Sequence, residues 1–303
     1  TPWILDSESY GGLIGEVMKR TVMPDFKGDV SVQLQLPNEW DPSIATTNIG
    51  VTAGVETDIC NPEWVTACNR MTAIVVPSQH VKSCLTNSGK VSVPIHVIPE
   101  AYSDAVTSIT PKLPDFSTSF NFLVFGQMTG NNPENDRKNT FYTIKWLCET
   151  FKDDPDVGIV LKTNVGRNSK IDRLVTRNMV TAIANEARKG SAGPKIHLLH
   201  GDMTDLEVAS LYRHDQIKAL VALTRGEGYG LPILEAAASA LPVIATGWSG
   251  HLDFLKHGKY VSIYYQLAPV HPTRIDGKIF VKGSRWANPS EDDFKKRVMK
   301  FRT

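Results

Sequence analysis

Short β-branched runs alternate with amphipathic stretches along most of the chain, and this alternation constrains the fold more than any other feature. The pattern predicts βαβ units, in which parallel strands are covered by helices. With 303 residues and a hydrophobic content of 41%, the chain is long enough for two domains, each with its own core. The fold class that we expect is therefore α/β, with two doubly wound parallel sheets.

The first third of the chain is predicted to form one small doubly wound sheet. Its strands are expected at residues 3–6, 30–36, 48–54, 72–77 and 93–99, and its helices at residues 13–22, 62–71 and 78–89. Ser78 and Gly89 fit the two ends of the last helix, because serine caps helix N-termini and glycine often follows a helix.

A stretch rich in Ser, Thr and Pro at residues 101–119 is typical of a linker. We place the domain boundary near Pro114, which gives an N-terminal domain of residues 1–113 and a C-terminal domain of residues 114–303. The second domain is expected to have strands at residues 120–126, 158–163, 195–201, 218–224 and 242–246. Its helices are expected at residues 140–151, 204–214 and 231–240, with a further long helix running through residues 180–190.

The charge balance of 33 Lys and Arg against 32 Asp and Glu gives no net field that would draw the chain onto nucleic acid or an anionic membrane. No apolar run approaches the roughly 18 to 20 residues of a membrane-spanning helix. The four cysteines have neither CxxC nor metal-binding spacing, so we expect buried reduced thiols and a cytoplasmic location. The chain begins at Thr1 without Met, so a fragment of a larger protein is one interpretation.

The most informative segment is TRGEGYGLPILEAAASALPVIATGWSG, residues 224–250, which joins a strand end, a glycine-rich loop and a helix start. Ligands of open α/β sheets bind at such strand ends. Glycines at 226, 228 and 230 let the backbone approach a ligand closely, and Pro232 suits the first turn of a helix, where free N–H groups bind anions. We expect donor-side contacts from consecutive loop residues, namely Gly228, Tyr229, Gly230 and Leu231.

Two carboxylates belong to this segment. Glu227 lies in the glycine-rich loop, and Glu235 lies about one turn into the following helix. Carboxylates are good acceptors for the hydroxyls of a sugar or a ribose, so both are candidate ligand contacts. The alternative is a surface loop in which a helix N-terminus favours a nearby acidic side chain. For either glutamate taken alone, both interpretations stay open.

The segment resembles the donor-binding signature of retaining GT-B glycosyltransferases, specifically the family 4 glycosyltransferases. Their EGFGLPxLEAxAxGxPVIA pattern stands here as EGYGLPILEAAASALPVIA. The resemblance implies a GT-B architecture, with two Rossmann-like domains facing a cleft. It also implies that Glu227 lies near the donor sugar and that Glu235 holds the ribose. Ala240 stands where the family often has Gly, at the helix end.

A second match is FLVFGQMTGNNPENDRKNTF, residues 122–141, where the family has a strand ending in Gly-Arg, a short loop, and Lys opening a helix. Gln127 replaces that Arg, and the loop is enlarged. Lys138 stands directly before the predicted helix and is our main phosphate ligand, because a fixed cation stabilises a departing diphosphate. The alternative is an exposed basic helix start without a role. Further donor-side candidates are Gln127, Arg137, Lys162 and Arg225.

The first domain carries a thinner match over residues 49–100, which resemble the acceptor-side segment of the family. Glu56 and Asp58 follow a predicted strand at the place where many relatives have a His that contacts the donor sugar. They are candidates for the acceptor or sugar side, and a solvated turn is the equal alternative. Gly11 and Gly12 resemble the glycine loop near the diphosphate, with a plain tight turn as the other interpretation.

A metal site is not expected. Asp154-Pro155-Asp156 has the Asp-x-Asp pattern of metal-dependent glycosyltransferases, but it precedes a predicted strand, whereas ligands bind where strands end. The eight histidines have no HExxH spacing, and the sequence contains no Walker loop or nucleophile elbow.

Together these features predict a retaining, metal-independent hexosyltransferase of polysaccharide or glycoconjugate synthesis, in which Glu227 and Lys138 carry the chemistry. Its only cofactor-like group would be the nucleoside diphosphate sugar co-substrate. The expected partners are that donor and a glycan, lipid-linked or other hydroxyl acceptor, without nucleic acid. Peripheral association with the inner face of a membrane stays open. The alternatives are a non-catalytic sugar-nucleotide-binding subunit and a GT-B phosphorylase or epimerase. Donor, acceptor and oligomeric state depend on loop shapes that one sequence does not fix.

Overall fold

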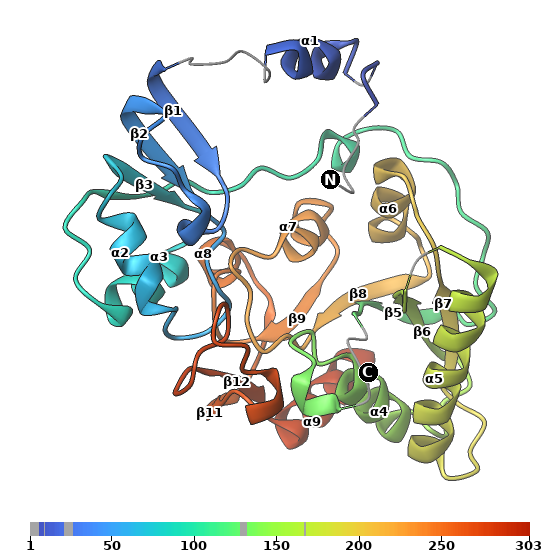
Figure 1. Ribbon diagram of the computed structural model, residues 1–303. Coiled ribbons are helices and arrows are strands. Elements are labelled where there is room, and N and C mark those ends of the chain that lie inside the picture. Colours follow the sequence, from blue (N-terminus) through green and yellow to red (C-terminus); the bar gives the residue numbers. More distant parts are fainter. Residues whose placement is uncertain (1–5, 9, 21–26, 128–131, 167) are drawn as a thin grey trace.

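The computed structural model describes residues 6–8, 10–20, 27–127, 132–166 and 168–303, and it contains two parallel β-sheets (Figure 1). The first sheet has the strand order β1-β2-β3-β4, and the second has the order β10-β9-β8-β5-β6-β7. The predicted α/β class is confirmed. In the second sheet the direction of winding reverses between β5 and β8, and open α/β sheets bind ligands at such a switch point.

The first sheet lies where the sequence predicts it, with two helices packed on its buried side chains. Its strands are β1 (Gly28–Leu34), β2 (Ala45–Val51), β3 (Ala73–Val76) and β4 (Ile95–Val97), and its helices are α2 (Pro62–Cys68) and α3 (Gln79–Ser88). Ser78 caps α3 as predicted, because its hydroxyl accepts the N–H of Val81. Within the described residues the strand order is sequential, so the crossovers run in one direction.

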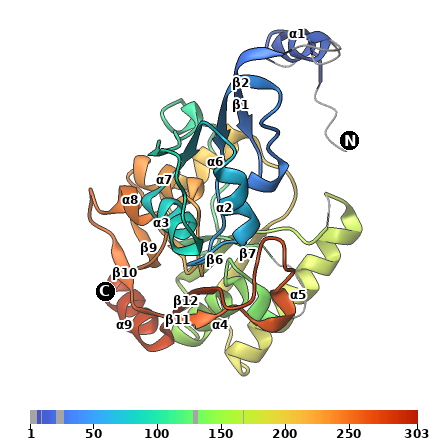
Figure 2. The same cartoon turned by 60° about the vertical axis from the view of Figure 1, so that its left-hand side comes forward.

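The N-terminal helix α1 (Leu13–Arg20) has no buried residue, and it lies at the periphery of the molecule in both views (Figures 1 and 2). The strand predicted at residues 3–6 lies outside the described residues except for Asp6, which has no regular structure.

The second sheet confirms the predicted elements as far as β9. Its strands are β5 (Phe120–Phe125), β6 (Val157–Lys162), β7 (Lys195–Leu199), β8 (Ile217–Ala222), β9 (Val243–Thr246) and β10 (Val261–Ile263). The helices around it are α4 (Thr140–Thr150), α5 (Lys170–Arg188), α6 (Asp205–Tyr212), α7 (Leu231–Ala238), α8 (Leu252–Leu255) and α9 (Glu291–Arg302).

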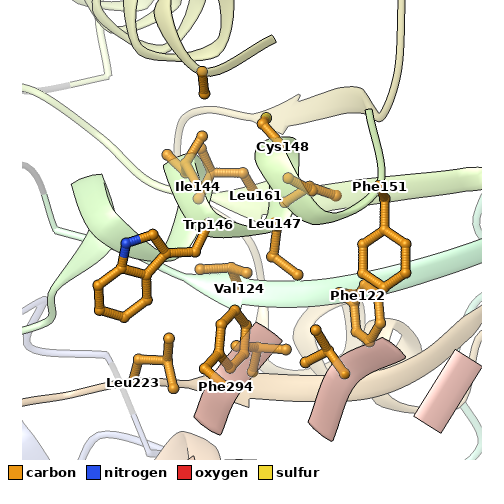
Figure 3. Packing of buried hydrophobic residues seen from close by; sticks show 14 of the residues in the cluster. Phe122, Val124, Ile144, Trp146, Leu147, Cys148, Phe151, Leu161, Leu223 and Phe294 are labelled. Atoms are coloured by element: carbon orange, nitrogen blue, oxygen red, sulfur yellow. The ribbon is translucent and has the colours of Figure 1, made fainter. Parts of the chain in front are cut away.

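Both faces of the second sheet are buried, which explains its continuous apolar strands. Successive residues of a strand point to opposite faces. Ile159 and Leu161 of β6 therefore pack in one cluster with α4, α5 and α9 (Figure 3), whereas Val160 packs in another with α6, α7 and α8.

The segment after β10 forms a hairpin of two antiparallel strands, β11 (Tyr265–Pro269) and β12 (Arg285–Pro289). Its buried Val270, Phe280 and Trp286 belong to the same hydrophobic cluster as the side chains of α2, β3 and α3. The sequence division at Pro114 assigns this hairpin to the second domain, yet its apolar side chains pack against the first. The hairpin therefore joins the two domains.

The four cysteines are all buried and free, in agreement with the predicted reduced thiols. Across the residues that the structure describes, no helix is both long enough and apolar enough to cross a bilayer.

Helix α9 is anchored on the second sheet by Phe294, which is fully buried beside Trp146 (Figure 3). We expect Phe294→Ala to lower the free energy of unfolding by about 3–5 kcal/mol, because it removes a buried ring and leaves a cavity. Chemical denaturation followed by circular dichroism would measure the loss. The control is Met299→Ala in the same helix, where the side chain is 49% exposed and the change is expected to be small. Equal stabilities for the two variants would contradict this packing.

Candidate active site

Glu227 lies at the centre of the candidate site, in the loop between β8 and α7. Its Oε1 atom is 2.6 Å from Lys138 Nζ, and its Oε2 atom is 3.1 Å from Arg137 Nη1. The side chain is almost fully buried, and burial opposes ionisation. Lys138 and Arg137 nevertheless hold the pKa of the Glu227 carboxyl below its ordinary value. Glu227 is therefore an anion at neutral pH, held between two cations.

The two cations directly precede α4, and the carboxylate of Asp136 accepts backbone N–H groups there. Asp136 Oδ1 accepts the N–H of Lys138 at 2.9 Å, and its second oxygen accepts the N–H of Thr140. Arg137 Nη1 also donates to the carbonyl of Gly226 at 2.7 Å. The two motifs found separately in the sequence thus meet at the carboxyl ends of the neighbouring strands β5 and β8.

The second glutamate of the motif lies on α7, one turn after the glycine-rich loop. Glu235 is partly buried, and its Oε2 accepts the hydroxyl of Tyr212 at 3.1 Å. Gly230 precedes the helix with a φ of 99°, a conformation that favours glycine. Ala240 also has a positive φ, of 60°, which gives a physical reason why glycine suits this helix end.

The glycine-rich loop lies directly against the backbone of the first domain. A Cβ atom at Gly226 would stand 2.1 Å from the carbonyl oxygen of Glu56, and one at Gly228 would stand 2.5 Å from that of Ala53. Ser78 at the start of α3 donates to the carbonyl of Gly228 at 2.6 Å. The backbone of the first domain thus makes a close approach to this loop.

A small cavity lies beside the buried cluster among the described residues. A cavity lined by Lys138, Glu227 and Gly230 has a volume of about 30 Å³. This volume holds about a single water molecule, whereas ligand sites usually measure about 300–1,000 Å³. All the residues that line this cavity belong to the second domain.

One acidic residue of the first domain reaches the cations. Glu56 Oε1 is 3.3 Å from Arg137 Nε, so the ion-paired cluster consists of Glu56, Arg137, Lys138 and Glu227. Asp58 does not belong to this cluster. Its carboxylate accepts two hydrogen bonds from Arg285 of β12 and links the turn to the hairpin.

Comparison with known proteins gives one family match, and it covers part of this site. Residues 178–266, which contain the glycine-rich loop and both glutamates, match the family model for glycosyl transferases group 1. No curated protein sequence matches the chain.

The described part of the chain has the GT-B fold, with two Rossmann-like α/β domains. One similar structure is described as trehalose-6-phosphate from E. coli bound with UDP-2-fluoro glucose, with a TM-score of 0.57, 9% identity, and coverage of 83% of this chain and 65% of that chain. Another is sucrose-phosphate synthase from Thermosynechococcus elongatus, with a TM-score of 0.56, 11% identity, and coverage of 90% and 64%. The chain spans less than two thirds of the length of these structures.

Two further candidate residues, Arg225 and Lys162, contact other side chains and carbonyls of the protein. Arg225 is almost fully buried, donates to Asn288 Oδ1 at 2.7 Å, pairs with Glu134 at 3.2 Å, and stacks on Trp286. It ties the glycine-rich loop to the hairpin. Lys162 donates to the carbonyl of Gly201 at 2.5 Å and so links the ends of β6 and β7.

The remaining candidate residues range from buried to solvent-exposed. Gln127 is exposed at the end of β5, and Leu231 is 39% exposed at the start of α7. Tyr229 is buried and packs its ring on Phe254. Gly11 and Gly12 lie before α1, where a Cβ would meet no atom within 4 Å, and the structure does not bring them to the cluster (Figure 1). Their positive φ angles agree with the tight-turn interpretation.

The sequence interpretation missed the loop after β9, which also contacts Glu227. Ser249 Oγ accepts the N–H of Glu227 at 2.9 Å, and the N–H of Gly250 donates to the carbonyl of Glu227 at 2.9 Å. Neither residue type is specific for a function. Their position after a strand of the same sheet was the available signal, since strand ends gather at one edge.

Asp154 and Asp156 lie before β6 and not at its carboxyl end. Arg302 of α9 pairs with both, at 3.1 Å and 4.0 Å. Among the described residues, no group of three or more His, Cys, Asp or Glu side chains is placed to hold a metal ion.

The contact between the glycine-rich loop and the first domain gives a direct prediction. Gly226→Ala places a Cβ too close to the Glu56 carbonyl, so we expect either a lower unfolding midpoint or a larger radius of gyration as the domains move apart. Thermal unfolding and small-angle scattering measure the two effects. The control is Gly258→Ala, where a Cβ would meet no atom within 4 Å. Gly226→Ala with unchanged midpoint and unchanged radius would show that the domains do not meet in this way.

Proposed function

We propose that this chain transfers a hexosyl-type group from a nucleoside diphosphate sugar to an acceptor hydroxyl, with retention of the anomeric configuration. The observation that carries the proposal is the Glu227 carboxylate held between Lys138 and Arg137 at the ligand-binding edge of the second sheet. The group 1 match over residues 178–266 supports glycosyl transfer. The similar E. coli structure bound with UDP-2-fluoro glucose supports a nucleoside diphosphate hexose as the class of donor.

Each member of the cluster has a role in donor binding. Lys138 and Arg137 bind the diphosphate, together with the free N–H groups at the start of α7. Glu227 accepts hydrogen bonds from the sugar, and Glu235 accepts them from the ribose. Glu56 faces the same cations from the first domain and contacts the sugar or the acceptor once the donor is bound. The diphosphate replaces carboxylates as partners of Lys138 and Arg137, so their charges stay compensated.

In this transfer the protein mainly positions the donor and the acceptor and stabilises the charge of the leaving diphosphate. The bond between the anomeric carbon and the diphosphate oxygen breaks, and the acceptor oxygen bonds to the same carbon on the same face. The acceptor proton passes to the departing phosphate oxygen. Lys138 and Arg137 stabilise the charge that grows on this oxygen, so their effect is larger in the transition state than in the ground state.

A panel of nucleoside diphosphate sugars tests the function. Purified chain should release nucleoside diphosphate from one donor in the presence of a hydroxyl acceptor, and proton NMR of the product should show the donor's anomeric configuration. Binding without release would instead support a non-catalytic sugar-nucleotide-binding subunit. Release of a sugar phosphate in the presence of inorganic phosphate would support a phosphorylase. Absence of binding across the panel would contradict the proposal.

Lys138→Ala should weaken binding of the nucleoside diphosphate by about 10- to 100-fold, because it removes a charge-assisted hydrogen bond worth about 1.5–3 kcal/mol. Binding of the free nucleoside should change less than twofold. Isothermal titration calorimetry measures both, with Lys152→Ala as a control, since Lys152 is exposed and pairs only weakly with Asp153 at 3.9 Å. Equal losses for the nucleoside and its diphosphate would argue against a phosphate role for Lys138.

Activity should survive removal of divalent cations. The fixed charges of Lys138 and Arg137 provide the compensation that a metal supplies in Asp-x-Asp enzymes. We expect excess EDTA to leave the rate of diphosphate release within about twofold, since loss of a catalytic metal would remove several kcal/mol of stabilisation and nearly all turnover. Loss of activity with EDTA and recovery with manganese or magnesium would disprove this distribution of charge.

A further inference from the structure

The loop after β9 binds the backbone of Glu227 on both sides. Ser249 Oγ accepts its N–H at 2.9 Å, and the N–H of Gly250 donates to its carbonyl at 2.9 Å. A Cβ at residue 250 would stand 2.0 Å from the carbonyl oxygen of Gly228, so only glycine allows this close approach. The position of Glu227 along the glycine-rich loop is therefore fixed by two adjacent residues of another strand end.

Ser249 itself has a backbone conformation that serine rarely adopts. Its φ is 91°, in the region that favours glycine, and the residue is buried. Glycine would satisfy this backbone without strain but would provide no hydroxyl. Strained residues of this kind often mark positions where the side chain has a function. The backbone conformation at this position favours glycine, so the reason for a serine lies in its hydroxyl group.

His251 determines the direction of that hydroxyl. The ring is fully buried, and its Nε2 lies 2.8 Å from the carbonyl oxygen of Thr246. A carbonyl only accepts, so Nε2 carries the hydrogen and Nδ1 is free to accept. Nδ1 lies 3.3 Å from Ser249 Oγ and accepts its proton. Burial lowers the pKa of the imidazole, which keeps the ring in this neutral form.

We propose that Ser249 and His251 are positioning residues that hold the backbone of Glu227, so that its carboxylate reaches the donor sugar. The hydrogen bonds run from Glu227 N–H to Ser249, from Ser249 O–H to His251, and from His251 N–H to Thr246. This inference rests on the proposed function for the role of Glu227. It places the control of sugar recognition in the loop after β9, separately from the cations that bind the diphosphate.

The test variant is Ser249→Gly, because glycine adopts a φ of 91° freely and the substitution removes only the hydroxyl. We expect kcat for diphosphate release to fall at least tenfold and the affinity for the nucleotide sugar to fall. The affinity for the nucleoside diphosphate alone should stay within twofold. The control is Ser239→Ala at the end of α7, where the described residues give the buried hydroxyl no hydrogen-bond partner. Wild-type kcat in Ser249→Gly, or an equal loss for the nucleoside diphosphate, would overturn the inference.

A second readout needs no substrate, and so separates this inference from the proposed function. In wild type, Lys138 and Arg137 hold the pKa of Glu227 low. Carbon-13 NMR of the glutamate carboxyls should show that Glu227 titrates at higher pH in Ser249→Gly, because the carboxylate no longer keeps its place between the cations. An unchanged titration would overturn the positioning role even if donor turnover is found. A changed titration in a chain that binds no donor would refute only the proposed function.

The coupling of the two residues can be tested separately. His251→Phe keeps an aromatic ring in the buried site but removes the acceptor for Ser249. If the residues act through one chain of hydrogen bonds, the double variant with Ser249→Gly should lose no more kcat than Ser249→Gly alone. Additive losses would show that His251 does not act through Ser249. Thermal unfolding of each variant confirms that the compared proteins are folded.

Discussion

The ion-paired cluster around Glu227 is the interaction on which the geometry of this molecule depends. A buried carboxylate is costly unless cations and hydrogen bonds compensate it, and here Lys138 and Arg137 provide that compensation. The requirement fixes where α4 begins, because both cations precede its first turn. It also fixes the glycine-rich loop against the end of β5. The same cluster extends through Glu56 to the first domain, so one set of charges aligns three separate parts of the chain.

The closed arrangement of the loop has a consequence for ligand binding. Gly226 and Gly228 let the first domain approach to within contact of the loop, and Ser78 adds a hydrogen bond across the same boundary. In the proposed function, a donor provides anionic oxygens to Lys138 and Arg137 in place of the carboxylates.

Much of the fold could be predicted from the sequence, because strand and helix periods are local properties. The predicted series holds up to β9, and the group 1 motif correctly indicated the edge of the sheet where Lys138 and Glu227 meet. The hairpin of β11 and β12 could not be predicted in the same way, since Trp286 is buried by side chains of the other domain. The pairing of Glu56 with Arg137 is likewise a contact distant in sequence. Gly11 is a different case. Its residue pattern resembles the glycine loop near the diphosphate, but in the structure it lies away from the ion-paired cluster.

A crystal structure of the chain with a bound nucleoside diphosphate tests the central claim most directly. The account predicts a diphosphate oxygen within about 3 Å of Lys138 Nζ and further oxygens on the free N–H groups at the start of α7. It also predicts that the contact between Glu56 and Arg137 is broken. A diphosphate bound elsewhere on the chain, with the pairs of Glu227 and Glu56 intact, would contradict the account.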